Sequence, residues 1–523
     1  MTEKYDVVII GGGHNGLIVG CYLAKAGQSV CVVEKQDMVG GGVVTREVTI
    51  PGFKHDLAAI SHTFIQRNPL IAQDELKLQS EYGLKYVSID PVQSVLFPDG
   101  TALIIYQDID KTCESIAQFS QSDAERYRQY CKTAEQILKV AGVASFSPPP
   151  AFGKLSSFLD ASEDGREYLR SLFSCYLHLA EEYFESEQMR VALCRYASEH
   201  MISPRDQGGG IHVFGFYTVL KHVVPIGGSG ALSEALAACL RDVGGTIKLS
   251  STVNSVKIQH GEAQGVVLEN GKEILARKAV ISNLNVKQLF LDLLPPEQLP
   301  QGFQAKVRHL RHGYSCILQS IALNQAPRFK AEDDVNKSVM VEFTPFTQEL
   351  LRIFDDIAYG APRNEIPFLC VPTLVDPTRA PEGKHTLYLY HYEPYDLMDG
   401  GTVKWDEIKQ DIADGILDTV KKHATNLGPE NILGRHIMSP VDFEKYNPSF
   451  VKGDILHIRA FAHEIFSNRP LPGWGQYRTP IKKLYMCGAS THPGGGVTGG
   501  GRAAVQAIME DLELDFQKAI AKR

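Results

Sequence analysis

The chain opens with two short apolar runs separated by an amphipathic stretch. Residues 5–10 are rich in β-branched side chains, as expected of a strand that is buried on both faces. Residues 17–26 carry apolar positions at helical spacing, and Gly27 is placed to end that helix. A second β-branched run covers residues 29–33. The pattern predicts a strand–helix–strand unit of a parallel sheet within about thirty residues.

Later segments follow other patterns. Residues 111–199 have helical composition, interrupted by prolines at 148–150. Residues 225–275 give a glycine-rich turn, a helix and then short alternating strands. Residues 301–440 mix strands and helices, and residues 484–514 indicate a strand, a turn and a helix. This order predicts an α/β fold with a helical insert.

Composition narrows the class of protein. The 523 residues are 44% hydrophobic and 22% charged, with a formal charge of −8, which excludes disordered and fibrous proteins. At about 100 to 200 residues per domain, two or three domains are expected. Charge is not clustered as nucleic-acid binding requires. The ten cysteines form no C-x-x-C pair, so we expect no metal site and a reducing compartment.

The first glycine-rich turn has the spacing of a phosphate-binding loop. Gly11, Gly13 and Gly16 form G-x-G-x-x-G between a predicted strand and a predicted helix, and Glu34 ends the next strand. The glycines let the backbone approach a pyrophosphate, the helix N-terminus supplies N–H donors, and a carboxylate binds ribose hydroxyls. Because Glu34 would repel a 2′-phosphate, we expect an adenine dinucleotide without one.

Three motifs resemble the FAD-dependent amine oxidase and phytoene desaturase superfamily. Glu34-Lys35-x-x-x-x-Gly40-Gly41 resembles its second phosphate-contacting stretch. Residues 227–283 resemble its return segment, in which the backbone at the Val253 position contacts adenine. Residues 484–499 resemble the flavin-contacting end of bacterial-type carotenoid desaturases. The sequence of residues 13–17, Gly-His-Asn-Gly-Leu, resembles that of carotenoid ketolases and of the pyridine nucleotide-disulfide oxidoreductase domain-containing protein 2 group.

The resemblance implies FAD and a Rossmann-type FAD-binding domain assembled from residues 1–75, 225–300 and 440–523. Residues 76–224 and 301–439 would form a mixed α+β substrate domain that carries the helical insert. The implied cofactor-binding positions are Gly11, Gly13, His14, Asn15, Gly16, Glu34, Lys35, Gly40, Gly41, Gly42, Val253, Gly488, Val497 and Thr498.

The sequence departs from amine oxidases at two positions. Gly42 stands where they usually carry arginine, and Ala489 stands where an acidic residue is common. Both departures favour the carotenoid-desaturase-like branch, from which Ser490 differs in turn, since glycine is more usual there. The helix that begins near residues 497–501 would direct its positive end at the flavin and stabilise the reduced form.

Two histidines are the catalytic candidates. His492 lies inside the C-terminal motif, where either its side chain or only its backbone meets the flavin. His62, like Asp56, falls where the superfamily passes its chain beside the flavin. The alternative for this second segment is a polar loop that satisfies its own backbone.

The helical insert contains further candidates. Arg190, Arg195, His200, Arg205 and His212 could form a lid over substrate, or else be solvated and ion-paired residues, which is the more common case. A stripe of apolar residues is interpreted mainly as core, with contact to a membrane surface as the alternative if it is exposed. The stripe consists of Phe152, Phe158, Leu159, Tyr168, Leu172, Phe173 and Tyr176.

The expected function is FAD-dependent removal of hydride from a bulky apolar substrate, isoprenoid or carotenoid-like, with oxygen or a quinone as electron acceptor. Two alternatives stay open: a flavin oxidase of an alcohol, amine or aromatic side chain, and a redox-neutral isomerase or non-catalytic flavin-binding protein.

No second G-x-G-x-x-G between a strand and a helix is present, which argues against an NAD(P)H domain. A cytoplasmic location is expected, with peripheral membrane contact as a further option. The oligomeric state is left open.

Overall fold

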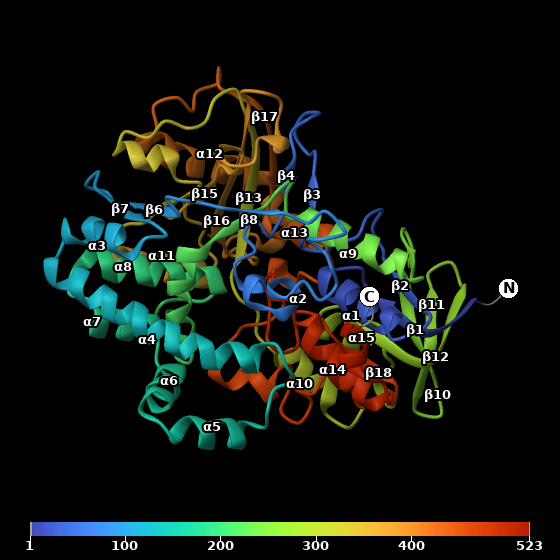
Figure 1. Cartoon of the computed structure of the whole chain (residues 1–523). Coiled ribbons are helices and arrows are strands. Elements are labelled where there is room, and N and C mark those ends of the chain that lie inside the picture. The colour runs from blue at the N-terminus through green and yellow to red at the C-terminus, as the bar shows by residue number, and fades with distance from the viewer. Residues whose placement is uncertain (1–2, 522–523) are drawn as a thin grey trace.

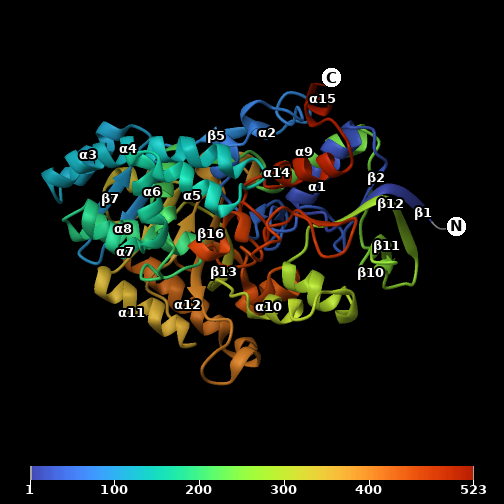
Figure 2. The ribbon, with the colours of Figure 1, turned by 90° about the horizontal axis from the view of Figure 1, so that it is seen from below.

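The computed structural model describes residues 3–521, except the side chains of residues 140, 141, 143 and 211. Two seven-stranded sheets lie side by side, with helices packed around both (Figure 1). Both ends of the described chain lie on the side of the first sheet in both views (Figures 1 and 2). The predicted α/β class is confirmed.

The first sheet has the strand order β10-β11-β12-β1-β2-β9, and β18 pairs with β12 beyond the end of β11. β1 lies parallel to β2 and β12, with Val7 opposite both Val30 and Ala279. The strands come from three separate stretches of the chain, as expected of a discontinuous Rossmann-type domain. They are β1 (Glu3–Ile10), β2 (Val30–Val33), β9 (Thr246–Lys248), β10 (Val253–Gln259), β11 (Glu262–Leu268), β12 (Glu273–Ser282) and β18 (Leu484–Met486).

Three helices share one apolar cluster on a face of this sheet, and α1 (His14–Lys25) packs against both α9 (Gly230–Asp242) and α14 (Gly501–Asp511). α1 is apolar around most of its circumference, so it is buried from Asn15 to Ala24 between the sheet, α9 and α14. The helix ends as the sequence predicts, because Gly27 follows with a positive φ of 88°. α15 (Phe516–Ala521) packs on α1, and α10 (Phe303–His309) contributes to the apolar cluster on the opposite face of the sheet.

The second sheet has the order β17-β13-β16-β15-β14-β6-β7 and is antiparallel except for the pair β14–β6. Alternate side chains of β13 enter two different apolar clusters, as the two-residue period of a strand requires. Ile317 and Ile321 face α12 (Trp405–His423), whereas Cys316 and Leu318 face the helical insert. The strands are β6 (Gln93–Leu96), β7 (Ala102–Ile105), β13 (Ser315–Leu323), β14 (Met340–Phe343), β15 (Phe368–Cys370), β16 (His385–Glu393) and β17 (Ile432–Met438).

The helical insert covers one end of the molecule, away from the first sheet (Figures 1 and 2). Its helices are α3 (Ile109–Ala117), α4 (Gln121–Ser145), α5 (Phe152–Asp160), α6 (Glu163–Phe173), α7 (Tyr176–Tyr183) and α8 (Glu187–Ala197), and α11 (Thr347–Ala358) packs on α8. Short elements join the two halves: β3 (Thr45–Arg46), β4 (His55–Asp56), β5 (Tyr86–Ser88), β8 (Val223–Pro225), α2 (Pro69–Ala72) and α13 (Pro440–Tyr446).

Most of the apolar stripe is core, as interpreted from the sequence. Leu159, Leu172 and Tyr176 are buried, whereas Phe158 and Phe173 are 66% and 55% exposed. Within residues 3–521, no helix combines the length and the apolar character needed to cross a bilayer. The exact domain boundaries given above stay predictions.

Candidate functional site

A cavity of about 320 Å³ runs from the glycine loops of the first sheet to the inner face of the second. At one end it is lined by the turns that follow β1, β2 and β12. At the other end it is lined by strands β6, β13, β14, β15 and β16 and by α8. The carboxyl ends of the parallel strands therefore open into the cavity, which is where α/β sheets bind their ligands.

The first glycine loop lies against the second one. The Gly40 N–H donates to the Gly12 carbonyl at 2.9 Å, and a Cβ placed on Gly41 would lie 3.3 Å from the Gly13 Cα. A Cβ on Gly13 would lie 2.7 Å from Nδ2 of Asn283. Larger side chains here would separate the two loops or fill the cavity, so the glycines keep backbone exposed to a ligand.

Glu34 lies at the end of β2 and lines the cavity, as the ribose-binding prediction requires. Its Oε2 accepts from the Gly12 N–H at 2.6 Å and its Oε1 accepts from the Gln36 N–H at 2.8 Å. Burial raises the pKa of the carboxyl group, although these backbone donors lower it in part. Val253 lines the same end of the cavity.

The C-terminal motif meets the first helix at the cavity. The Gly501 N–H, in the first turn of α14, donates to Oδ1 of Asn15 at 2.9 Å, so the N-termini of α1 and α14 lie together. Asn68 donates from Nδ2 to the carbonyls of Thr498 and Gly499, which fixes the turn before α14. Two helix N-termini at one cavity form a favourable site for negatively charged groups.

Most predicted cofactor-binding residues line this cavity. Those that do are Gly11, Gly13, His14, Asn15, Glu34, Lys35, Gly40, Gly41, Gly42, Val253 and Val497. Gly16, Gly488 and Thr498 do not, and the two glycines act through packing. A Cβ on Gly16 would lie 2.5 Å from the Gly11 carbonyl, and one on Gly488 would lie 2.7 Å from the Asn283 carbonyl.

The catalytic candidates are placed differently, because neither histidine side chain lines the cavity. His62 is fully buried with its Nε2 3.0 Å from Oγ of Ser229 and its Nδ1 3.2 Å from the Tyr86 hydroxyl. His492 bonds through Nε2 to the Ala144 carbonyl at 2.8 Å. Burial lowers their pKa values to about 3 and about 4. Both catalytic assignments stay predictions that this geometry does not support.

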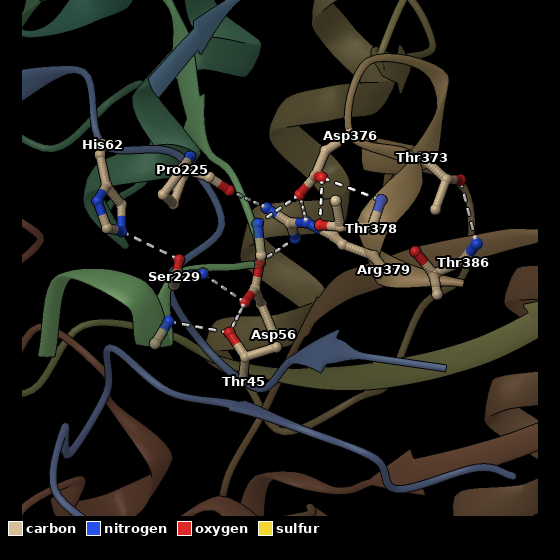
Figure 3. A network of polar contacts seen from close by, with 12 residues as sticks. Thr45, Asp56, His62, Pro225, Ser229, Thr373, Asp376, Thr378, Arg379 and Thr386 are labelled. Atoms are coloured by element: carbon tan, nitrogen blue, oxygen red, sulfur yellow. Dashed lines mark hydrogen bonds and ion pairs between the residues drawn. The ribbon is translucent and has the colours of Figure 1, made fainter. Parts of the chain in front are cut away.

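Asp56 does not line the cavity and belongs to a buried ion-pair network with a distant part of the chain, which differs both from flavin contact and from a loop that satisfies its own backbone (Figure 3). Its carboxylate accepts from Nη1 of Arg379 at 2.6 Å, from the Ser229 N–H at 2.8 Å and from Oγ1 of Thr45 at 2.6 Å. Arg379 also donates from Nε to Asp376 at 2.9 Å and from Nη2 to the Pro225 carbonyl at 2.9 Å. The network ties β3, β4 and the turn before α9 to the segment between β15 and β16 of the second sheet.

Sequence reasoning missed several cavity residues. Asn283 follows β12 directly and packs beside the first glycine loop. Because β12 is a buried strand that pairs with β1, the position of Asn283 at its end could have indicated a cavity residue. His457 lines the cavity with its Nδ1 3.2 Å from Oγ of Ser490, but nothing local in the sequence marks it. Ala489 also lines the cavity, whereas Ser490 does not.

The far end of the cavity is mainly aromatic, with methionine, cysteine and a few polar side chains beside the rings. Phe64, Met340, Phe368, Tyr388 and Tyr390 line it. Among the lid candidates, Arg205 is exposed and paired with Asp355, Arg190 bonds to the Phe184 carbonyl, and Arg195 is fully buried beside the cavity. His200 and His212 are stacked on each other at 4.3 Å between ring centroids. The structure therefore does not bring these five residues together at the cavity.

The residues present fit a dinucleotide. The glycine loops leave backbone open to the cavity, and two polar atoms at this end, Nε2 of His14 and Oγ1 of Thr498, are buried without a hydrogen-bond partner within the described part of the chain. Such atoms are uncommon in folded proteins unless a ligand or water satisfies them. FAD would lie with its phosphates at the glycine loops and with Glu34 at a ribose.

Comparison with known proteins agrees with this geometry. A model of the family "Flavin containing amine oxidoreductase" matches residues 16–509. Pyridine nucleotide-disulfide oxidoreductase domain-containing protein 2 of Rattus norvegicus is 30% identical, over 98% of this chain and 94% of that protein. A limonene dehydrogenase subunit of Castellaniella defragrans is 27% identical, over 98% and 96%, and the lycopene-forming phytoene desaturase of Pantoea ananas is 25% identical, over 96% and 99%.

Solved structures agree on the fold. Putrescine oxidase bound to putrescine superposes with a TM-score of 0.62 at 17% identity, over 98% of this chain and all of that one (100%). The resemblance stated from the sequence is therefore confirmed, and so is FAD as the cofactor. The chain belongs to the flavin-containing amine oxidoreductase family and is an FAD-dependent oxidoreductase.

Proposed function

We propose that the chain dehydrogenates a bulky, mainly apolar substrate, as a desaturase or a hydrocarbon dehydrogenase does. The observation that carries this proposal is the continuity of the cavity from the glycine loops into a chamber of aromatic, methionine and cysteine side chains beneath the second sheet. A chamber of this composition favours apolar substrates, because burial of apolar surface supplies the binding free energy. Relatives named as a limonene dehydrogenase subunit and a phytoene desaturase support the same class.

The residues of this chain would bind the substrate, orient it toward the cofactor and exclude water. Phe64, Phe368 and Tyr388 give the substrate an apolar wall. Tyr388 is held in place by its hydroxyl, which donates to the Ala58 carbonyl at 2.8 Å. FAD held at the glycine loops would supply the hydride acceptor for a substrate C–H bond, with oxygen or a quinone as the final electron acceptor. The helix N-termini of α1 and α14 would stabilise the negative charge of the cofactor.

The test is anaerobic reduction of the purified holoprotein by fractions of a cell extract. Bleaching of the flavin absorbance by the apolar lipid fraction is expected. Bleaching by the polar fraction alone would contradict the proposal and would favour an oxidase of a soluble alcohol or amine. Flavin that is bound but never reduced by either fraction would favour the isomerase or the non-catalytic alternative.

A further inference from the structure

A small polar group interrupts the apolar wall at the far end of the cavity. Glu342 on β14 and Gln93 on the neighbouring strand β6 both line the cavity and are 1% and 2% exposed. Oε2 of Glu342 and Nε2 of Gln93 are buried without a hydrogen-bond partner within the described part of the chain. The Gln93 amide lies close enough to lower the pKa of the Glu342 carboxyl group, but the two groups do not meet in hydrogen-bond geometry. An acceptor and a donor are thus left unsatisfied, which costs free energy unless something binds them.

The charges around this pair decide what can bind. Arg195 is fully buried and lies 3.3 Å from Oε1 of Glu199 and 3.8 Å from Oε1 of Glu342. Glu199 also accepts from the hydroxyls of Tyr390 and Tyr392 at 2.6 and 3.0 Å. Arg195 is therefore shared between Glu199 and Glu342, and Oε2 of Glu342 remains without a hydrogen-bond partner within the described residues. Burial raises the pKa of Glu342 to about 7, although Arg195 lowers it in part.

Three kinds of ligand group can be compared at this position. An anion would be repelled by Glu342 and Glu199. An ammonium group would satisfy Glu342 but would lie close to Arg195 and could accept nothing from the Gln93 amide. A hydroxyl group donates one hydrogen bond and accepts another, so it satisfies both unpartnered atoms without adding charge.

We propose that Glu342 and Gln93 form a subsite for a neutral hydroxyl group on an otherwise apolar substrate. This inference rests on the proposed function and narrows the class of substrate, because a pure hydrocarbon would leave both polar atoms unsatisfied. The subsite would fix which end of a long substrate enters the chamber first, and therefore which carbon lies at the flavin.

The test is equilibrium binding to the anaerobic holoenzyme, followed by flavin absorbance, with farnesene, farnesol, farnesyl methyl ether and farnesylamine as probes. Farnesol is expected to bind about tenfold more tightly than farnesene, the usual effect of one or two buried hydrogen bonds. At pH 8, where Glu342 is mainly ionised, the methyl ether, which cannot donate to the carboxylate, should lose most of this advantage. In Gln93→Met the preference for farnesol should fall to about twofold.

Ser94→Ala is the matched control, because Ser94 is the next residue of β6 and its hydroxyl bonds to Ser338. It should keep the preference for farnesol. Equal affinity for farnesol and farnesene in the wild type would overturn the subsite and leave the apolar-substrate proposal intact, as expected if water satisfies the pair. Tighter binding of farnesylamine than of farnesol would also overturn it. Binding of none of the probes would overturn the subsite and the proposed function together.

Discussion

Replacement of Arg379 by methionine is the most direct test of the ion-pair network in Figure 3. Arg379 is fully buried and makes hydrogen bonds to Asp56, Asp376 and the Pro225 carbonyl. Burial works against its charge, but the two carboxylates raise its pKa overall. Methionine keeps much of the side-chain volume, so the main effect is the loss of charge and donors.

The expected cost is about 3–5 kcal/mol in the free energy of unfolding, the usual range when one partner of a buried pair is removed. It is this large because Asp56 and Asp376 would remain buried without their cation. The measurement is urea unfolding of the holoprotein at neutral pH, followed by circular dichroism and by flavin release.

Arg128→Met provides the control. Arg128 is paired with Asp110, but both side chains are exposed, so this change should cost less than about 1 kcal/mol. Equal losses for the two variants would refute the reasoning, because burial would then not be the source of the effect. Flavin release should begin earlier in Arg379→Met, since the network holds the loop before β3, which lines the cavity.

Three further predictions concern cofactor, pH and surface. Glu34→Ala and Gly13→Ala should each lose FAD on purification, and full flavin content in both would show that the cofactor site is wrongly placed. Because Glu342 binds its proton more tightly in the folded state, the stability that this group contributes should be lost as pH rises from 4.5 to about 7. Glu342→Gln should therefore gain stability relative to the wild type between pH 5 and pH 8, and the difference between the urea midpoints of the two proteins measures this gain. If exposed Phe158 and Phe173 contact a membrane, liposomes should protect α5 and α6 from proteolysis in the wild type but not when both are serine.

The sequence predicted the parts of the site that are encoded locally. A G-x-G-x-x-G between a strand and a helix, with Glu34 after the next strand, specifies its own geometry, and these residues line the cavity. The orientations of the His62 and His492 side chains could not be predicted in this way, since position within a motif does not determine where a side chain points. Gln93 and Glu342 meet only because β6 pairs with β14 across a long stretch of chain. Pairing of that kind leaves no local pattern.

The hydrogen bond between Asn15 and Gly501 has a consequence for synthesis on the ribosome. The first strand–helix–strand unit leaves the exit tunnel well before the helix N-terminus that completes its anion site, because Asn15 and Gly501 are 486 residues apart. The nascent chain therefore carries an open half-site while the intervening residues are made, with α1 lacking the partner helix that covers it. Cofactor capture is expected only after α14 has been made, and chaperones that shield apolar helices would act before it.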